Sequence, residues 1–289
     1  GLPTADVAMS GIVVTGGAVV GSGRQIFVQS GILRLTDVSV SDNRASDAGG
    51  GIAAGTGTTL NLLRTLVTGN AITGGMGVGG GVVVNGAFDI DTSVISSNSA
   101  GTGGFGGGLA VATSLTPIVG TVENSTIAGN LAGNVGGGVY LDLGGLASSV
   151  TVTNSTISGN AAAGDGGGAF LTDGAVAATL NFRNSTIAYN SAGTDGTGVG
   201  GGVRIADGGS ALQVVSIDNT IVSNNVDQGG ANGLVRNLGS TLNASYSLFQ
   251  ATPAAGAING TNVSNLTNAD PKLGPLANNG GYGQTHLLR

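Results

Sequence analysis

The sequence predicts an all-β fold: a single-stranded, right-handed parallel β-helix of about 7–9 coils, with roughly 30 residues in each coil. Three observations predict it. Two sequence markers recur together with one period, the runs between them alternate apolar and polar residues, and no segment combines a helical period with capping residues. The Gly-rich composition therefore has a structural origin, because the glycines recur at fixed places in the repeat.

The first marker is an asparagine that closes each repeat, with an aliphatic residue three positions before it. The steps between successive asparagines are 27 to 34 residues long. The asparagines are Asn43, Asn70, Asn98, Asn130, Asn160, Asn190 and Asn224. The aliphatic residues are Val40, Val67, Ile95, Ile127, Ile157, Ile187 and Ile221. We expect the aliphatic column to stack inside the coil and the asparagine column to lie at a corner, bonded to the neighbouring coil.

The second marker is a cluster of three glycines that keeps the same period. It occurs at residues 49–51, 79–81, 106–108, 136–138, 166–168 and 200–202. Collagen is excluded, because glycine does not fall at every third position and the chain has only 5 prolines. A β-propeller blade needs about 40 residues, more than these steps provide. We expect the clusters at a corner where backbones approach closely or φ is positive.

The elements of one repeat follow in order in residues 136–160. After the glycines, 139–141 alternates apolar and polar residues and predicts a strand with one buried face. Further short strands are predicted at 150–153 and 155–158. Such strands cannot bury their apolar faces alone, so successive repeats must stack, with each strand parallel to its copy about 4.8 Å away.

The two ends of the chain depart from the repeat. The run at 10–17 is typical of the end of an earlier coil, so we expect the native chain to continue upstream, or another element to cover that end. Beyond Asn224 the pattern decays. We predict a repeat domain at residues 1–250 and a loop-rich C-terminal cap or tail at 251–289, which is rich in proline and glycine turns.

The motifs resemble a known group of proteins. Repeats of the form NSTIxGN joined by GGG-apolar runs, followed by DPKLGPLANNGGYGQTH at 270–286, resemble the bacterial choice-of-anchor Q proteins. The repeats are also similar to those of polymorphic outer membrane proteins and autotransporter passengers. The resemblance covers residues 10–288 and implies an exported, often surface-associated, right-handed parallel β-helix without shared catalytic residues. The family pattern extends past Arg289, so we expect a fragment or a processed subunit.

Composition excludes several classes of function. The net charge of −6 opposes nucleic-acid binding, which requires a basic surface. The chain has no cysteine, so neither a disulfide framework nor thiolate chemistry is expected. No run of 18 apolar residues is present, so no transmembrane helix is predicted.

Three aspartates are candidates for an enzymatic or binding edge. Asp142, Asp173 and Asp207 follow the first strand of three successive coils, and a glycoside hydrolase needs carboxylates that converge on one bond. Each also precedes or lies near glycine, which is ordinary turn chemistry. Turn formation, calcium or sugar binding, and catalysis are the alternatives. We predict no cofactor and no metal site, with calcium at this edge as the alternative. His286, in the terminal motif, is either a catalytic base or a hydrogen-bonding residue of the cap.

The middle residues of the first strands form an outward column. The column comprises Ala53, Val83, Ala110, Tyr140, Phe170 and Arg204. Tyr140, Phe170 and Arg204 on a flat sheet would form a platform for a sugar ring or a partner. The alternative is that aromatic stacking rigidifies the face, or that a loop covers it.

We therefore predict a non-enzymatic, extracellular or cell-surface protein of bacterial type with a structural or adhesive role. Its coil ends would allow head-to-tail self-association into a surface fibre, since heterologous contacts that do not close give filaments. Surface glycans or host cell-surface molecules are further expected partners. The alternative function is a carbohydrate-active β-helix enzyme, a polysaccharide hydrolase or lyase, that uses the aspartate edge.

Overall fold

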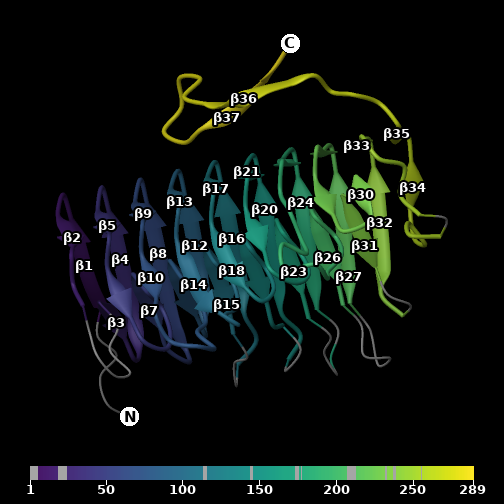
Figure 1. The fold of residues 1–289 in the computed structure, drawn as a ribbon. Helices are drawn as coiled ribbons and strands as arrows, with labels where there is room; N and C mark the ends of the chain where they lie inside the picture. Colours follow the sequence, from purple (N-terminus) through teal and green to yellow (C-terminus); the bar gives the residue numbers. More distant parts are fainter. Residues whose placement is uncertain are drawn as a thin grey trace.

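The computed structural model describes residues 6–18, 25–112, 116–143, 146–172, 176, 178–206, 213–231, 233–236, 239–254 and 256–289. All regular elements in these ranges are β-strands. The coils stack along one axis, and each strand pairs in parallel with its copy in the neighbouring coil (Figure 1). The predicted all-β solenoid is confirmed.

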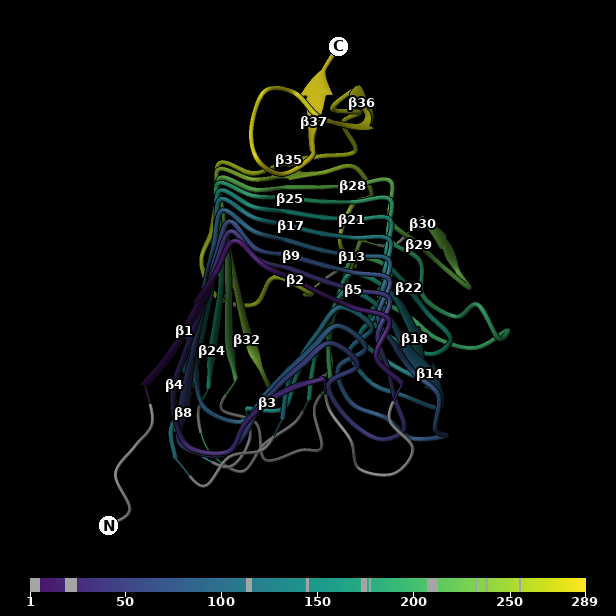
Figure 2. The ribbon, with the colours of Figure 1, turned by 90° about the vertical axis from the view of Figure 1, so that its left-hand side faces the viewer.

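Two long sheets form two walls of the coil in the part of the chain that is described (Figure 2). Sheet A contains β1 (Asp6–Ser10), β4 (Gly31–Thr36), β8 (Thr58–Leu63), β12 (Ala87–Asp91), β16 (Val119–Glu123), β20 (Ser149–Thr153), β24 (Thr179–Arg183), β27 (Val214–Asp218), β32 (Thr241–Ser245) and β34 (Asn262–Val263). Sheet B contains β2 (Val13–Thr15), β5 (Ser39–Ser41), β9 (Leu66–Thr68), β13 (Val94–Ser96), β17 (Thr126–Ala128), β21 (Thr156–Ser158), β25 (Thr186–Ala188), β28 (Ile221–Ser223), β33 (Leu248–Phe249) and β35 (Leu266–Thr267).

Two shorter sheets complete the cross-section. Sheet C contains β6 (Arg44–Ala45), β10 (Ala71–Ile72), β14 (Ser99–Thr102), β18 (Leu131–Gly133) and β22 (Ala161–Ala162). Sheet D contains β3 (Ile26–Val28), β7 (Ile52–Ala54), β11 (Val82–Val84), β15 (Leu109–Val111), β19 (Val139–Leu141), β23 (Ala169–Leu171), β26 (Val203–Ile205) and β31 (Leu234–Arg236). A small antiparallel pair, β29 (Val226–Asp227) and β30 (Gly230–Ala231), extends from a later coil.

The interior of the coil is a continuous apolar core built from the inward residues of the strands. Ile127, Ile157 and Ile187 pair in register in sheet B and are fully buried. Val139 and Leu141 of β19 also point inward, as the alternation predicts. Each buried aliphatic side chain contributes about 1.5–3 kcal/mol of stabilisation.

A buried asparagine ladder runs along the corner between sheets B and C. The backbone N–H and the side-chain Nδ2 of Asn130 both donate to Oδ1 of Asn160, at 3.0 and 2.9 Å. Asn160 repeats both bonds to Asn190, and its Nδ2 also donates to the carbonyl of Ile127 at 3.0 Å. The ladder thus satisfies polar groups that would each cost about 1–3 kcal/mol if buried without a partner.

The last ladder position corrects the sequence assignment by one residue. Asn190 bonds to Asn225, not to Asn224, and Ile187 pairs with Val222 rather than with Ile221. Asn224 has a φ of 54° and takes the left-handed position that precedes each ladder asparagine. Two adjacent asparagines fit these two positions, because asparagine tolerates the left-handed conformation. A longer step, which is 35 residues here, moved the ladder by one place.

A second ladder, of hydroxyl residues, lies at the corner between sheets A and B and was not predicted. Ser125 donates its backbone N–H to Oγ of Ser155 at 3.1 Å, and Ser155 donates to Ser185 at 3.2 Å. The residue before each of these serines is an asparagine with positive φ. The NST triplet is therefore a corner asparagine, a buried ladder serine and the first strand residue of sheet B.

The glycine clusters combine a positive φ with close backbone contact. Gly136 has a φ of 72°. A Cβ atom on Gly137 would lie 2.5 Å from the carbonyl oxygen of Gly167 and 2.5 Å from the carbonyl carbon of Ala161. Any side chain at this position would separate adjacent coils, so the second glycine is required by packing.

The C-terminal segment first continues the coil and then turns back along it. Beyond residue 250, β34 and β35 still pair with β32 and β33 in sheets A and B. An antiparallel hairpin follows, with strands β36 (Leu273–Ala277) and β37 (Thr285–Leu288). It lies over the outer face of sheet B (Figures 1 and 2). We call residues 273–288 the C-terminal hairpin.

Candidate functional site

The C-terminal hairpin is held against sheet B by side chains of three coils. Thr126 Oγ1 donates to the carbonyl of Gln284 at 2.9 Å, and the Tyr189 hydroxyl donates to the carbonyl of Leu273 at 3.2 Å. Gly283 lies directly above Thr126, where a Cβ atom would clash with Oγ1. The hairpin therefore rests on sheet B at defined positions along the coil stack.

His286 is the central contact of this interface. Its Nδ1 lies 2.7 Å from the carbonyl oxygen of Gly274, and its Nε2 lies 2.9 Å from Oγ of Ser158. Because a carbonyl can only accept, Nδ1 carries the hydrogen of the neutral imidazole, and Ser158 donates its hydroxyl hydrogen to Nε2. The imidazole also packs against the Tyr189 ring, with the centroids 5.1 Å apart.

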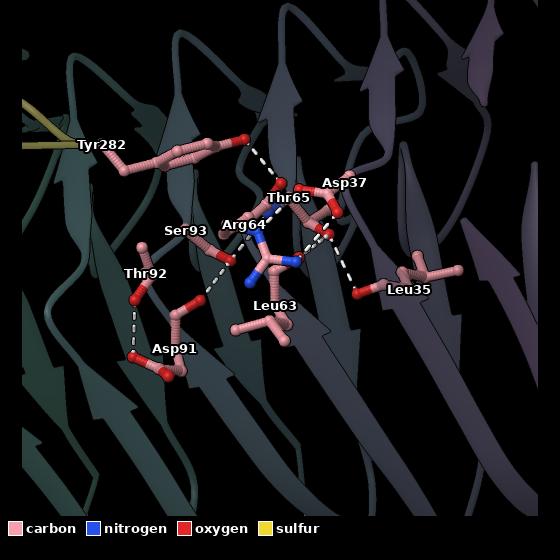
Figure 3. A network of polar contacts seen from close by, with 9 residues as sticks. All are labelled: Leu35, Asp37, Leu63, Arg64, Thr65, Asp91, Thr92, Ser93 and Tyr282. Carbon is pink, nitrogen blue, oxygen red and sulfur yellow. Dashed lines mark hydrogen bonds and ion pairs between the residues drawn. The ribbon is translucent and has the colours of Figure 1, made fainter. Parts of the chain in front are cut away.

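The tip of the hairpin is tethered to the corner between sheets A and B (Figure 3). The Tyr282 hydroxyl donates to the backbone carbonyl of Arg64 at 2.5 Å. The Arg64 guanidinium makes a two-pronged ion pair with Asp37, with distances of 2.7 and 2.9 Å. The hydrogen bond from Arg64 lowers the pKa of Asp37 below the ordinary value, and partial burial of the Tyr282 ring raises the pKa of its hydroxyl.

Between these contacts, the hairpin and sheet B enclose a groove of about 640 Å³, which we call the hairpin groove. It is lined by Ser96, Ser97, Ala128, Gly129, Ser158, Gly159, Tyr189, Pro275, Leu276, Gln284 and His286. A Cβ atom on Gly129 or Gly159 would meet nothing closer than 3.9 Å, so these glycines form an open stretch of the groove floor.

Tyr189 is the residue of the groove that sequence reasoning missed. It has a φ of 57° at the corner position that glycine occupies in the two preceding coils, Gly129 and Gly159. A side chain there costs about 1–2 kcal/mol of backbone strain. Strained residues persist where the surroundings hold them, and they cluster at functional sites. The signal was available, because the repeat ends in AYN at 188–190 where the two preceding copies end in AGN and SGN.

The predicted aspartate edge stays a prediction. Asp142 is half-buried, and its backbone N–H donates to the carbonyl of Val111 at 2.9 Å, as in an ordinary sheet ladder. Its carboxylate accepts a hydrogen bond of 3.4 Å from Thr172. Asp173 and Asp207 lie outside the described residues. Within the described ranges, His, Asp and Glu residues form no group of three that could hold a metal ion.

The predicted aromatic platform on sheet D is present as a stack but is not open. The rings of Tyr140 and Phe170 are stacked 6.1 Å apart, and Phe105 packs against Tyr140 at 5.3 Å. Phe170 and Arg204 are each only 9% exposed. Arg204 donates from Nε to Asp165 at 3.1 Å, and burial raises the pKa of Tyr140 to about 12.

Loops of the same coils provide this cover. Ala48, Val78 and Phe105, which precede the glycine clusters, bridge in parallel over the outer face of sheet D. Ala53, Val83 and Ala110 of the column form a small second apolar cluster beneath them. This part of the outward column is therefore a minor core, and a binding role for the remaining residues of the column stays a prediction.

Comparison with known proteins identifies one family. The family model of the right-handed β-helix region matches residues 26–216, about two thirds of the chain. It supports a parallel β-helix repeat protein and does not distinguish the choice-of-anchor Q or polymorphic outer membrane type from others. No curated protein and no solved structure matches the chain. In the described part of the chain, no helix has the length and apolar character needed to span a membrane.

Proposed function

The chain belongs to the right-handed β-helix family, and from this premise we propose that it is an extracellular adhesive rod that binds a surface glycan in the hairpin groove. The single observation that carries the proposal is the groove itself. One wall is a regular stack of coils and the other is the docked C-terminal hairpin, so the binding surface has a rigid support.

The lining of the groove fits a neutral polyhydroxylated ligand. Tyr189 is 42% exposed and presents an aromatic ring on which the apolar face of a sugar can stack. Ser96 and Ser97 supply hydroxyl groups, and Gln284 supplies an amide, which can donate to or accept from sugar hydroxyls. A volume of about 640 Å³ lies within the usual range of ligand sites, about 300–1,000 Å³.

The shape of the molecule supports an adhesive role. The strands of sheet A in the described ranges form a ten-stranded parallel sheet, which extends about 43 Å at the usual strand spacing. The asparagine and hydroxyl ladders connect each coil to the next, so the rod is continuous along this length. A groove on its flank is accessible to a glycan without disturbing the core.

A glycan array probed with the full chain, followed by titration of the best ligand, tests the proposal. Tyr189→Gly removes the aromatic ring and places here the residue that the two preceding coils have, so the coil stack should persist while affinity falls about tenfold or more, as loss of about 1.4 kcal/mol implies. The variant also loses the bond to Leu273, but the hairpin keeps its tethers at Thr126, Ser158 and Arg64. Tyr246→Gly is the matched control, because Tyr246 is also at positive φ (52°) and exposed but lies outside the groove lining. Equal binding by both variants would contradict the proposal.

Head-to-tail association is a second proposed property, favoured by the terminal strands of sheet B. Val13 on β2 is 66% exposed and Leu266 on β35 is 62% exposed, and each strand pairs on one side only within the described residues. Pairing of β35 with β2 of a second copy would cover both and propagate the sheet as a filament. Electron microscopy of the full chain over a concentration series tests this, and monomers at every concentration would refute it.

A further inference from the structure

Ser158 and His286 have the relative geometry of a nucleophile and its general base. Ser158 Oγ lies 2.9 Å from Nε2 of His286, and the Gly274 carbonyl oxygen lies 2.7 Å from Nδ1. Because that carbonyl can only accept, a neutral imidazole carries its hydrogen on Nδ1 and leaves Nε2 to accept the Ser158 hydroxyl hydrogen. A serine hydroxyl is activated when it bonds to a general base and a third group holds that base in the correct orientation. Here a backbone carbonyl is the orienting group.

An electrophile can approach this pair from the hairpin groove. Ser158 and His286 both line the groove, beside the open floor at Gly129 and Gly159. The adjacent Tyr189 ring closes the corner of the site and packs on the imidazole, which restrains its rotation. Ser158 is only 2% exposed and lines the groove, so a ligand can meet its hydroxyl only from within the groove.

Side chains, not backbone groups, would stabilise charge that develops on the ligand. The backbone N–H groups of Gly129 and Gly159 are committed to the coil ladder, where they donate to Ser158 and Ala188. Ser97 and Gln284 line the same groove, and neither side chain is hydrogen-bonded to another described residue. Their hydroxyl and amide groups are donors of the kind that hold an oxyanion.

We propose that Ser158 is a reactive nucleophile that accepts acyl groups from esters bound in the hairpin groove, with His286 as its general base. Ser158 Oγ forms a bond to the ester carbonyl carbon while its proton passes to Nε2 of His286. The ester C–O bond breaks, and the leaving alcohol takes that proton. Water then attacks the acyl carbon and loses a proton to Nε2 of His286. The bond between the acyl carbon and Ser158 Oγ breaks, Oγ takes the proton back from His286, and the carboxylic acid is released.

This activity would use the groove of the proposed function but does not require glycan binding. Each proposal can be refuted without refuting the other. Loss of serine reactivity with intact glycan binding removes only the present inference, and serine reactivity without glycan binding removes only the adhesive role. An acylated glycan is the ligand class that satisfies both.

The test treats the full chain with a fluorophosphonate probe, which bonds to an activated serine oxygen with release of fluoride, and maps the label by mass spectrometry. We expect one label on Ser158 and none on Ser158→Ala. His286→Gln should slow labelling about 100-fold or more, the usual contribution of a general base. Ser41→Ala, at the same strand position four coils away along sheet B and outside the groove lining, should label at the wild-type rate.

Tyr282→Phe separates base catalysis from hairpin docking, because it removes the tip tether and leaves the Ser158–His286 pair intact. It should retain most of the labelling rate, and ester hydrolysis measured with p-nitrophenyl acetate should follow the same order of variants. Absence of label on the folded wild-type chain, a label at another serine, or a labelling rate that is the same in His286→Gln would overturn the proposal.

Discussion

Parts of the outer faces of sheets D and B are covered, and the two covers form by different means. On sheet D, successive coils supply their own cover through the residues that precede their glycine clusters, Ala48, Val78 and Phe105. On sheet B, the cover is one hairpin from the end of the chain, whose tip contacts a residue 218 positions earlier. A repeated cover belongs to the fold, whereas a cover made once depends on a few side-chain contacts and forms the candidate site.

The largest effect should follow from a change in the core that both faces share. Ile157→Ala removes a fully buried side chain between Ile127 and Ile187, and we expect it to lower the free energy of unfolding by about 2–5 kcal/mol. Denaturant titration measures this. The loss should weaken the amide-exchange protection of sheets B and D together. A decrease in unfolding free energy below about 1 kcal/mol would show that packing in the aliphatic column does not stabilise the coil stack.

The next largest effect should follow from a change at the glycine corner between sheets C and D. Gly137→Ala places a Cβ atom within 2.5 Å of backbone atoms of Gly167 and Ala161, so we expect a loss of about 1–3 kcal/mol from overpacking. Gly75→Ala is the matched control, since a Cβ atom there meets nothing within 4 Å and its φ is not positive. Similar unfolding midpoints for the two variants would contradict the packing argument.

Release of the hairpin should lower the free energy of unfolding by a smaller amount, and the loss of protection should be confined to sheet B. His286→Ala removes the bonds to Ser158 and Gly274 and the ring contact with Tyr189, and we expect a loss of about 1 kcal/mol in unfolding free energy. Amide hydrogen exchange in residues 273–288 should accelerate while sheet D stays protected. Faster exchange in both faces would show that the hairpin supports the whole coil.

The smallest effect concerns the exposed ion pair near the hairpin tip. Arg64 holds the pKa of Asp37 below its ordinary value, so the pair stabilises the fold above the ordinary Asp pKa of about 3.9, and this contribution is lost as pH falls through the lowered pKa. Arg64→Met should raise the Asp37 pKa, observed by carboxyl NMR titration. The Tyr282 tether should survive, because it uses the Arg64 backbone carbonyl.

The repeat made the coil predictable from sequence, because spacing and alternation express local requirements. The Ile157 column, the Asn160 ladder and the corner glycines each satisfy packing or hydrogen bonding one coil away. The assignment failed at Asn224, where an adjacent asparagine satisfies the same chemistry and a longer loop changes the step. The repeat period alone cannot show which of two adjacent asparagines belongs to the ladder.

The hairpin groove was beyond sequence reasoning for a physical reason. Its contacts join residues 84 to 218 positions apart, occur once, and use common residue types, so no period reports them. His286 was recognised as either a base or a hydrogen-bonding residue, and the structure adds the two partners. Tyr189, at a corner where the two preceding coils have glycine, was a local sign that a distant segment packs here.

The contact between His286 and Tyr189 tests the central claim most directly, that the C-terminal hairpin docks on sheet B and forms the groove. His286 is the single histidine of the chain, so its imidazole protons can be assigned without ambiguity. With ring centroids 5.1 Å apart, nuclear Overhauser effects between the two rings should be observed in the folded chain. Their absence in a chain whose coil amides remain protected would contradict the account.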